Sequence, residues 1–254
     1  MDEAILSRQQ IADYTREGCL VVRDFYSAEE ILQISAWASE IKNYPETPGK
    51  YTMYFEQSLD DPNRRIINRI ENYCPYHDGF DTLARHSRLT DFVDRLFGEA
   101  SVLFKDKINF KMPGGDGFAP HQDVQAGWDA YAKLHVTALV SIDHATRENG
   151  CLEIAARPNK QELVGESWRP LGEEDTAGMT FEPVNTRPGD VIFFDSFVPH
   201  RSGPNHGDAP RRVLYVTYNR LSEGDHRAQY YADKRKSYPQ DCEREEGKDY
   251  VYRV

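Results

Sequence analysis

Side chains that commonly bind metal ions occur in two short motifs of this sequence. His121 and Asp123 lie two residues apart in a His-Gln-Asp motif, just after the glycine-rich segment 113–117. In an extended segment such residues point to the same side, so the imidazole and the carboxylate can converge on one point. A second motif places His200 after the apolar segment 190–197. Two imidazoles and one carboxylate form the facial triad of non-haem Fe(II) oxygenases, so we predict that His121, Asp123 and His200 bind Fe(II) and leave positions open for a co-substrate and O2.

The residues that follow His200 strengthen this prediction, because a His-x-Asp motif alone often occurs by chance. Ser202 comes two residues after this histidine, and Arg211 opens the next apolar segment. 2-Oxoglutarate chelates iron through its 2-oxo acid end, which leaves a far carboxylate for a guanidinium and a hydroxyl to bind. The order of metal ligand, hydroxyl and guanidinium therefore predicts 2-oxoglutarate as the co-substrate, bound by Ser202 and Arg211.

These motifs resemble those of the phytanoyl-CoA dioxygenase superfamily of Fe(II)/2-oxoglutarate enzymes. The resemblance extends over residues 10–225 and includes the segments 148–152, Glu-Asn-Gly-Cys-Leu, and 187–194, Arg-Pro-Gly-Asp-Val-Ile-Phe-Phe. It implies a double-stranded β-helix (jelly-roll) core, the iron and 2-oxoglutarate ligands named above, and a position near 2-oxoglutarate for Asn109. The chain departs from the family at 157–159, where it has Arg-Pro-Asn and many members have Gly-Ser-His.

Polar and apolar side chains alternate over residues 104–111, directly before the His-Gln-Asp motif. On one face of the predicted strand lie Lys105, Lys107, Asn109 and Lys111. On the other face lie Phe104, Ile108 and Phe110. The cationic face suits an anionic ligand if it lines the metal site, and the alternative is a face exposed to solvent. The resemblance places Lys105 and Lys107 near the substrate. Trp128 either closes one wall over the substrate or is simply a buried aromatic residue.

Within the superfamily, the segments 105–128 and 220–239 resemble a small bacterial subgroup that includes enzymes acting on 2-aminoethylphosphonate. This implies hydroxylation of that small anionic substrate at the carbon that bears phosphorus, with its ammonium near Glu71 or Asp106. The carboxylate of Asp123 favours hydroxylation over halogenation, since halogenating members of the wider group have Ala or Gly there. Two alternatives remain: a hydroxylase of a lipid-like or secondary-metabolite substrate, and a cupin-like protein that binds ligands without oxygenating them.

The elements that must position these residues begin with helices. Periodic patterns and a capping-box sequence at Ser27 to Glu30 predict helices at 7–16, 28–42 and 82–98. A short strand is expected at 18–22, and a loop at 43–63 because that segment is rich in Pro, Gly, Tyr and Asp. Segments 51–55 and 68–72 are expected to be surface loops, with a lid over the site as the alternative.

From residue 101 onward, short apolar runs separated by Gly, Pro and Asn predict a series of β-strands. Helices followed by strands are typical of an α+β fold, here with a jelly-roll core and flanking N-terminal helices. We expect one domain over 1–254, with a helical flank at 1–98, a core at about 100–220 and a charged C-terminal tail, including a surface helix, at 221–254.

Composition excludes several other classes of protein. The 254 residues carry a net charge of −11, which argues against sequence-independent nucleic-acid binding. No apolar stretch is long enough to cross a membrane, and the charged N-terminus lacks a signal-peptide core. The four scattered cysteines indicate reduced thiols, so we expect a cytoplasmic protein whose partner is a small-molecule substrate. The oligomeric state does not follow from the sequence.

Overall fold

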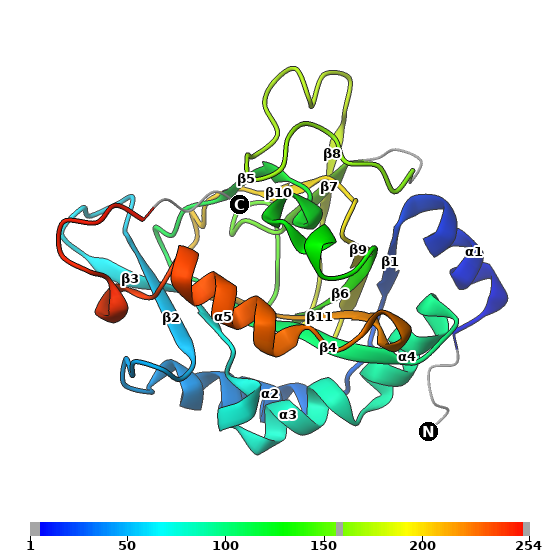
Figure 1. Ribbon diagram of the computed structural model, residues 1–254, viewed down its shortest axis with the longest axis horizontal. Coiled ribbons are helices and arrows are strands. Elements are labelled where there is room, and N and C mark those ends of the chain that lie inside the picture. Colours follow the sequence, from blue (N-terminus) through cyan, green and yellow to red (C-terminus); the bar gives the residue numbers. More distant parts are fainter. Residues whose placement is uncertain (1–5, 156–159, 251–254) are drawn as a thin grey trace.

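Two antiparallel β-sheets form the framework of the structure, a computed structural model that describes residues 6–155 and 160–250 (Figure 1). The larger sheet contains β1 (Cys19–Val22), β2 (Thr52–Gln57), β3 (Arg65–Glu71), β4 (Ser101–Lys111), β6 (His135–Ser141), β9 (Val191–Asp195) and β11 (Arg211–Arg220). Its strand order is β1-β9-β6-β11-β4-β3-β2. The smaller sheet contains β5 (Phe118–His121), β7 (Leu152–Ala155), β8 (Phe181–Val184) and β10 (His200–Ser202). Its order is β5-β10-β7-β8, so the predicted strands of the core are confirmed.

Most helices come from the N-terminal part of the chain, and serine residues cap the start of several of them. The helices are α1 (Arg8–Glu17), α2 (Ala28–Lys42), α3 (Asp78–Arg85), α4 (Arg88–Phe97) and α5 (Arg227–Ser237). At the start of α2, the Ser27 hydroxyl accepts a hydrogen bond from the Glu30 amide, as the capping-box pattern predicted. The single helix predicted at 82–98 is wrong. α3 ends at Arg85 and a new helix, α4, is capped by Ser87, whose hydroxyl accepts from the Leu89 amide and donates to the Leu83 carbonyl of α3.

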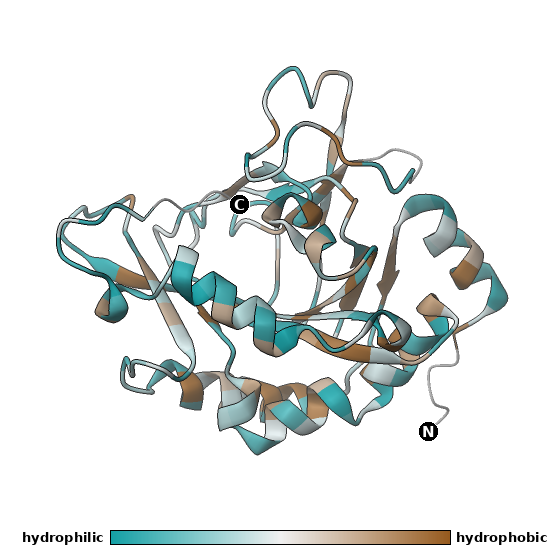
Figure 2. Ribbon diagram, viewed as in Figure 1, coloured by the Kyte–Doolittle hydropathy of each residue, from teal (hydrophilic) through white to brown (hydrophobic). Residues whose placement is uncertain are grey.

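Apolar side chains form two layers around the larger sheet. One layer lies between its outer face and helices α2, α3 and α4, and includes Ile34, Leu89 and Phe193. The other lies between the two sheets and includes Leu152 and Phe194. Figure 2 shows β1 and β9 as hydrophobic, which fits strands covered on both faces. The smaller sheet is therefore held against the larger one, as in a jelly roll.

The loop predicted at 43–63 is partly wrong, because this segment contains strand β2. Met53 on β2 is buried and pairs with Ile70 on β3. Segments 51–55 and 68–72 are thus largely buried strand residues and not surface loops or lids. Of the Pro and Gly residues that suggested a loop, Pro45, Pro48 and Gly49 lie before Tyr51 and Pro62 lies after β2, so the apolar residues between them can form the edge strand of the sheet.

Strand β4 departs from the predicted alternation at one position. Lys105 pairs with Thr217 of β11, but the next pair joins Leu103 with Tyr218, so Phe104 is an extra residue in a β-bulge. Phe104 packs against Trp128 and not against the core face that holds Ile108. The expectation that Phe104 shares a face with Ile108 is therefore wrong, and the bulge places an aromatic ring at the side of the site.

The C-terminal helix α5 is more buried than the surface helix that the sequence predicted. It is mostly hydrophilic (Figure 2), yet Tyr230 and Tyr231 are buried beside β4. The Tyr231 hydroxyl binds the backbone of Asp106, and Arg227 forms an ion pair with the Asp106 carboxylate. These polar contacts attach α5 to the strand that carries the lysines. None of the described helices has both the length and the hydropathy of a membrane span.

Phe193 gives a test of this architecture, because its fully buried ring stacks on Phe92 of α4 at 4.4 Å between centroids. Phe193→Ala should lower the free energy of unfolding by about 3–5 kcal/mol. The melting temperature should fall by about 6–20 °C in a chain of this size. Leu32→Ala, at a side chain that is 72% exposed, is the control and should change stability by less than about 0.5 kcal/mol. Equal stability of the two variants would contradict the packing described here.

Candidate metal centre

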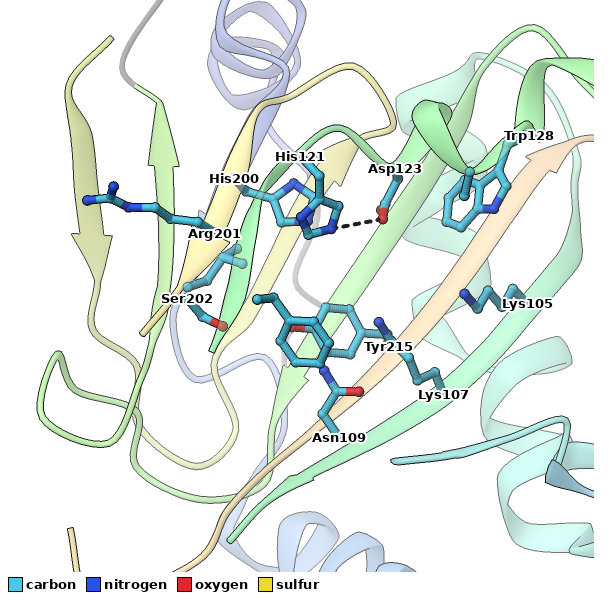
Figure 3. A pocket seen from close by; sticks show the side chains of 13 residues that line it. Lys105, Lys107, Asn109, His121, Asp123, Trp128, His200, Arg201, Ser202 and Tyr215 are labelled. Carbon is cyan, nitrogen blue, oxygen red and sulfur yellow. Dashed lines mark ion pairs between the residues drawn. The ribbon is translucent and has the colours of Figure 1, made fainter. Parts of the chain in front are cut away.

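The three predicted metal ligands converge at one point between the two sheets (Figure 3). His121 ends β5 and His200 begins β10, and the two residues are direct partners in the smaller sheet. Their ring centroids lie 4.3 Å apart, and His121 Nε2 lies 4.0 Å from Asp123 Oδ1. One ligand atom from each of the three side chains lies within 4.8 Å of the other two. This spacing fits coordination of a single ion by all three side chains.

Backbone carbonyls fix how the two imidazoles are turned. His121 Nδ1 lies 2.7 Å from the Ala119 carbonyl, and His200 Nδ1 lies 2.9 Å from the Val198 carbonyl. Hydrogen bonds at Nδ1 leave Nε2 of both rings as the atom that is free to bind a metal. Metal-binding histidines are commonly oriented in this way.

The residue between the two ligands of the first motif anchors that motif. Gln122 is fully buried, and its amide nitrogen donates to the carbonyls of Phe197 at 2.5 Å and Glu162 at 3.0 Å. Its amide oxygen accepts from the Val164 backbone at 2.6 Å. Gln122 thereby ties the first motif to the segment just before His200 and to the loop that starts after β7.

The electrostatics of the three side chains suit a cation. Burial, followed by the charge of His200, lowers the pKa of His121 to about 3, and burial also lowers the pKa of His200. Burial alone would raise the pKa of Asp123, but His200, His121 and nearby lysines outweigh it and hold that pKa below its usual range. The group therefore offers two neutral imidazoles and one carboxylate, the donor set that a divalent transition metal requires.

Of the two residues predicted to bind 2-oxoglutarate, Ser202 lines the pocket with the triad and Arg211 does not line it. Arg211 is 2% exposed and its Nη2 donates to the Gly150 carbonyl at 2.6 Å. Ser202 lies on β10 with His200, and its hydroxyl accepts from Lys111 Nζ at 2.8 Å. On the strand that Arg211 opens, the half-buried Tyr215 is the residue that lines the pocket.

Lys105 and Lys107 form a cationic wall of the same pocket. Lys107 Nζ lies 4.3 Å from the centre of the Tyr215 ring, and Lys105 Nζ lies 5.3 Å from that of Trp128. Burial, followed by the charge of Lys105, lowers the pKa of Lys107 to about 7. Asn109 is on the same wall (Figure 3), so the predicted polar face of β4 lines the site and is not exposed to solvent.

The carboxylates proposed for a substrate ammonium are already engaged. Asp106 is fully buried and accepts from the backbone amides of Tyr73 and Cys74, in addition to its ion pair with α5. Glu71 is bound by Arg69 at 2.8 Å and by Lys234 at 2.5 Å. The expectation for Asp106 is wrong, because strand alternation turns its side chain away from the pocket.

The pocket contains almost all of the predicted site residues. Its lining includes Lys105, Lys107, Asn109, His121, Asp123, Trp128, His200 and Ser202. Trp128 is 2% exposed, so it is both a buried aromatic residue and part of the pocket wall. Sequence analysis missed Tyr215 and Phe118, which also line the pocket. Alternation along β11 from Arg211 would have indicated Tyr215, whereas Phe118 lies on the short strand β5, which no pattern predicted. The family difference at 157–159 lies outside the described residues.

Comparison with known proteins places the chain in a family. The family model for phytanoyl-CoA dioxygenase matches residues 14–213. A 2-aminoethylphosphonate dioxygenase from an uncultured bacterium is 39% identical over 96% of this chain and 93% of its own length. A methylphosphonate hydroxylase from Gimesia maris is 36% identical over 92% of this chain and 89% of its own length. The chain therefore belongs to the phytanoyl-CoA dioxygenase family.

Solved structures support the fold. EctD from S. alaskensis, crystallised with 2-oxoglutarate and 5-hydroxyectoine, has a TM-score of 0.71 and 23% identity over 88% of this chain and 79% of its own. The epimerase SnoN has a TM-score of 0.69 and 22% identity over 84% of this chain and 82% of its own. These similarities confirm the predicted jelly-roll fold.

Family membership makes the chain a 2-oxoglutarate-dependent dioxygenase, which confirms the predicted class of enzyme. The buried His–Asp–His group fits the facial triad of such enzymes. Fe(II), 2-oxoglutarate and O2 are therefore its cofactor and co-substrates, as predicted, and a cupin-like protein without oxygenase activity is excluded.

The lowered histidine pKa values give a prediction for the metal-free protein. Because a lowered pKa keeps an imidazole neutral to lower pH, His121, with a pKa of about 3, should stay neutral at pH 6, where an ordinary histidine is largely protonated, and His200 should gain its proton at a lower pH than an ordinary histidine. NMR of histidine-labelled, metal-free protein should show two imidazoles, those of His121 and His135, whose signals do not move between pH 5.5 and pH 8, and a third, that of His200, which titrates below pH 6.5. The same protein unfolded in denaturant is the control, in which all histidines should titrate near pH 6.5. Titration of every histidine of the folded protein near pH 6.5 would contradict this account.

Proposed function

We propose that this enzyme hydroxylates a small phosphonate at the carbon bonded to phosphorus, with 2-aminoethylphosphonate as the first candidate. The observation that carries the proposal is the pair of ammonium groups, Lys105 and Lys107, on the pocket wall beside the triad. Charges held in a poorly hydrated pocket are costly unless an ion of opposite sign joins them. A phosphonate dianion supplies two negative charges and three acceptor oxygens, which matches two lysine ammonium groups.

The two phosphonate enzymes among the relatives support the same class of substrate. Methylphosphonate is the second candidate, because the relative that acts on it covers nearly the whole chain at 36% identity. A lipid-like or secondary-metabolite substrate is disfavoured by the lysines and the amide that line the pocket. The proposal is therefore specific about the phosphonate group, and the two candidates differ in the rest of the substrate.

In this proposal each side chain of the site has a separate task. His121, Asp123 and His200 hold Fe(II), which together with 2-oxoglutarate and O2 supplies the oxidation of a C–H bond. Arg211 and Ser202 bind the far carboxylate of 2-oxoglutarate, and Asn109 lies close to that co-substrate. These residues fix where the co-substrate lies, so that the remaining volume of the pocket belongs to the substrate.

The substrate is held on the opposite part of the pocket. Lys105 and Lys107 bind the phosphonate oxygens, and this contact keeps the attached carbon on the side of the triad. Trp128 forms the adjoining wall and helps to exclude water from the reacting carbon. Specificity then arises from the fixed distance between the lysine wall and the metal ligands.

Loss of a metal ligand should abolish the reaction. His121→Ala and Asp123→Ala should each reduce substrate-stimulated formation of succinate to background, since the metal loses one of three protein ligands. Metal content after dialysis against Fe(II) or Mn(II) should fall in parallel, with an unchanged circular dichroism spectrum. Ala119→Ser is a matched control that should retain metal, because Ala119 contacts His121 only through its backbone carbonyl. Continued succinate formation by the Asp123 variant would show that the ligand assignment is wrong.

Removal of the lysine charges should weaken binding of the substrate but not of the co-substrate. Lys107→Met should raise the KM for 2-aminoethylphosphonate by about 10–100-fold, since a hydrogen bond to a charged group contributes about 1.5–3 kcal/mol. The KM for 2-oxoglutarate should change by less than about twofold. Lys42→Met, on the exposed side of α2, is the control and should leave both values unchanged. An unchanged KM for the phosphonate in both the Lys105 and the Lys107 variants would contradict the proposed substrate site.

A further inference from the structure

Glu71 is a buried carboxylate next to the lysine wall of the pocket. It ends β3, is 1% exposed and pairs in the sheet with Lys107 of β4. Arg69 Nε donates to its Oε1 at 2.8 Å, and Lys234 Nζ of α5 donates to its Oε2 at 2.5 Å. Burial alone would raise the pKa of Glu71, but the charges of Lys105, Lys234 and Arg69 outweigh it and hold that pKa well below its usual range. Glu71 is therefore ionised, and the cations around it outnumber it.

Lys105 lies between the pocket and helix α5, which runs beside β4 (Figure 1). Its Nζ lies 5.3 Å from the centre of the Trp128 ring and 5.6 Å from that of Tyr230 on α5. Lys234 follows Tyr230 by four residues, and its Nζ lies 6.0 Å from the centre of the same tyrosine ring. Among the residues that the structure describes, Lys105 has no ion pair. Its charge is therefore available to a ligand, although an ionised carboxylate is near.

The contacts of Glu71 explain why Lys105 is not paired with it. Each of the two carboxylate oxygens already accepts a charged donor, one from Arg69 and one from Lys234. A carboxylate oxygen without a partner attracts an ammonium strongly in a poorly hydrated interior. Without Lys234, the Oε2 atom would be free to draw Lys105 away from the pocket. The contact between α5 and β3 thus determines how much of the Lys105 charge faces the substrate.

We propose that Lys234 is a positioning residue of the substrate site, which binds Glu71 and thereby keeps the Lys105 ammonium directed at the phosphonate. The inference rests on the proposed function, in which Lys105 binds the phosphonate. It extends the substrate site to the C-terminal helix, although no residue of α5 lines the pocket. Two alternatives predict different results: Lys234 only fastens α5 to the sheet, or Glu71 itself binds the ammonium of 2-aminoethylphosphonate.

The test measures binding of 2-aminoethylphosphonate by isothermal titration calorimetry to protein loaded with Mn(II) and 2-oxoglutarate. Lys234→Met should raise the Kd by about 10-fold, because Glu71 is released and pairs with Lys105. Lys234→Arg keeps the ion pair and should bind nearly as tightly as the unmodified protein. The Kd for 2-oxoglutarate, measured before the phosphonate is added, should not change in either variant. Lys236→Met, at a side chain of α5 that is 78% exposed, is the matched control and should leave both values unchanged.

A double variant separates positioning from a merely structural role. Lys234→Met combined with Glu71→Gln removes the competing carboxylate, so the Kd should return to within about twofold of the original value. A structural lysine predicts no such rescue, because the double variant also lacks the ion pair between α5 and β3. Weak binding by the double variant, or undiminished binding by Lys234→Met, would overturn the proposal.

Glu71→Gln alone keeps the test decisive if Lys234→Met does not fold. Without the carboxylate Lys105 has no competing partner, so the affinity for 2-aminoethylphosphonate should be equal or higher. Weaker binding by this variant would contradict the proposal and indicate that Glu71 binds the substrate ammonium. Unchanged affinity in Lys105→Met, or no binding of the phosphonate by the unmodified protein, would show instead that the substrate site on which this inference rests is wrong.

Discussion

The direct pairing of His121 with His200 across β5 and β10 is the constraint on which the site depends. These strands are too short to be stable alone, and the apolar layer between the two sheets holds them against the larger sheet. The pairing places two imidazoles side by side, and the next turn of the chain adds Asp123. The larger sheet supplies the lysines and Arg211, which lie on the paired strands β4 and β11. A metal centre on one sheet thus faces binding residues on the other.

Charge is distributed very differently inside and outside the molecule. The chain has a net charge of −11, yet the pocket wall and the adjoining interior carry Lys105, Lys107, Lys111 and Arg211. Acidic groups near this wall, such as Glu71, are bound by other cations. An acidic protein can therefore hold a site for two anions, one at each end of the pocket. The overall charge describes the exposed surface and contains no information about the substrate.

The sequence was sufficient to predict those site residues that lie close together in the chain. The metal motif and the polar face of β4 could be predicted because residues two apart on a strand share a face. Strand β2 was missed, and a single helix was predicted at 82–98 where the chain forms two. Tertiary packing decides whether such a segment pairs with a sheet or breaks into two helices. The position of Phe104 depends on a bulge in the pairing of β4 with β11, which has no local signal. The burial of α5 depends on the contact between Arg227 and Asp106, residues far apart in the chain.

The central claim is that the lysine wall presents a phosphonate to the metal centre for hydroxylation of the carbon bonded to phosphorus. Phosphorus-31 NMR of a reaction with Fe(II), 2-oxoglutarate, O2 and 2-aminoethylphosphonate tests it most directly. The account predicts a new phosphonate signal that retains the carbon–phosphorus bond and grows in proportion to succinate, and methylphosphonate should behave similarly if only the phosphonate is recognised. An unchanged phosphorus spectrum for both compounds, from enzyme that binds metal and 2-oxoglutarate, would contradict the claim.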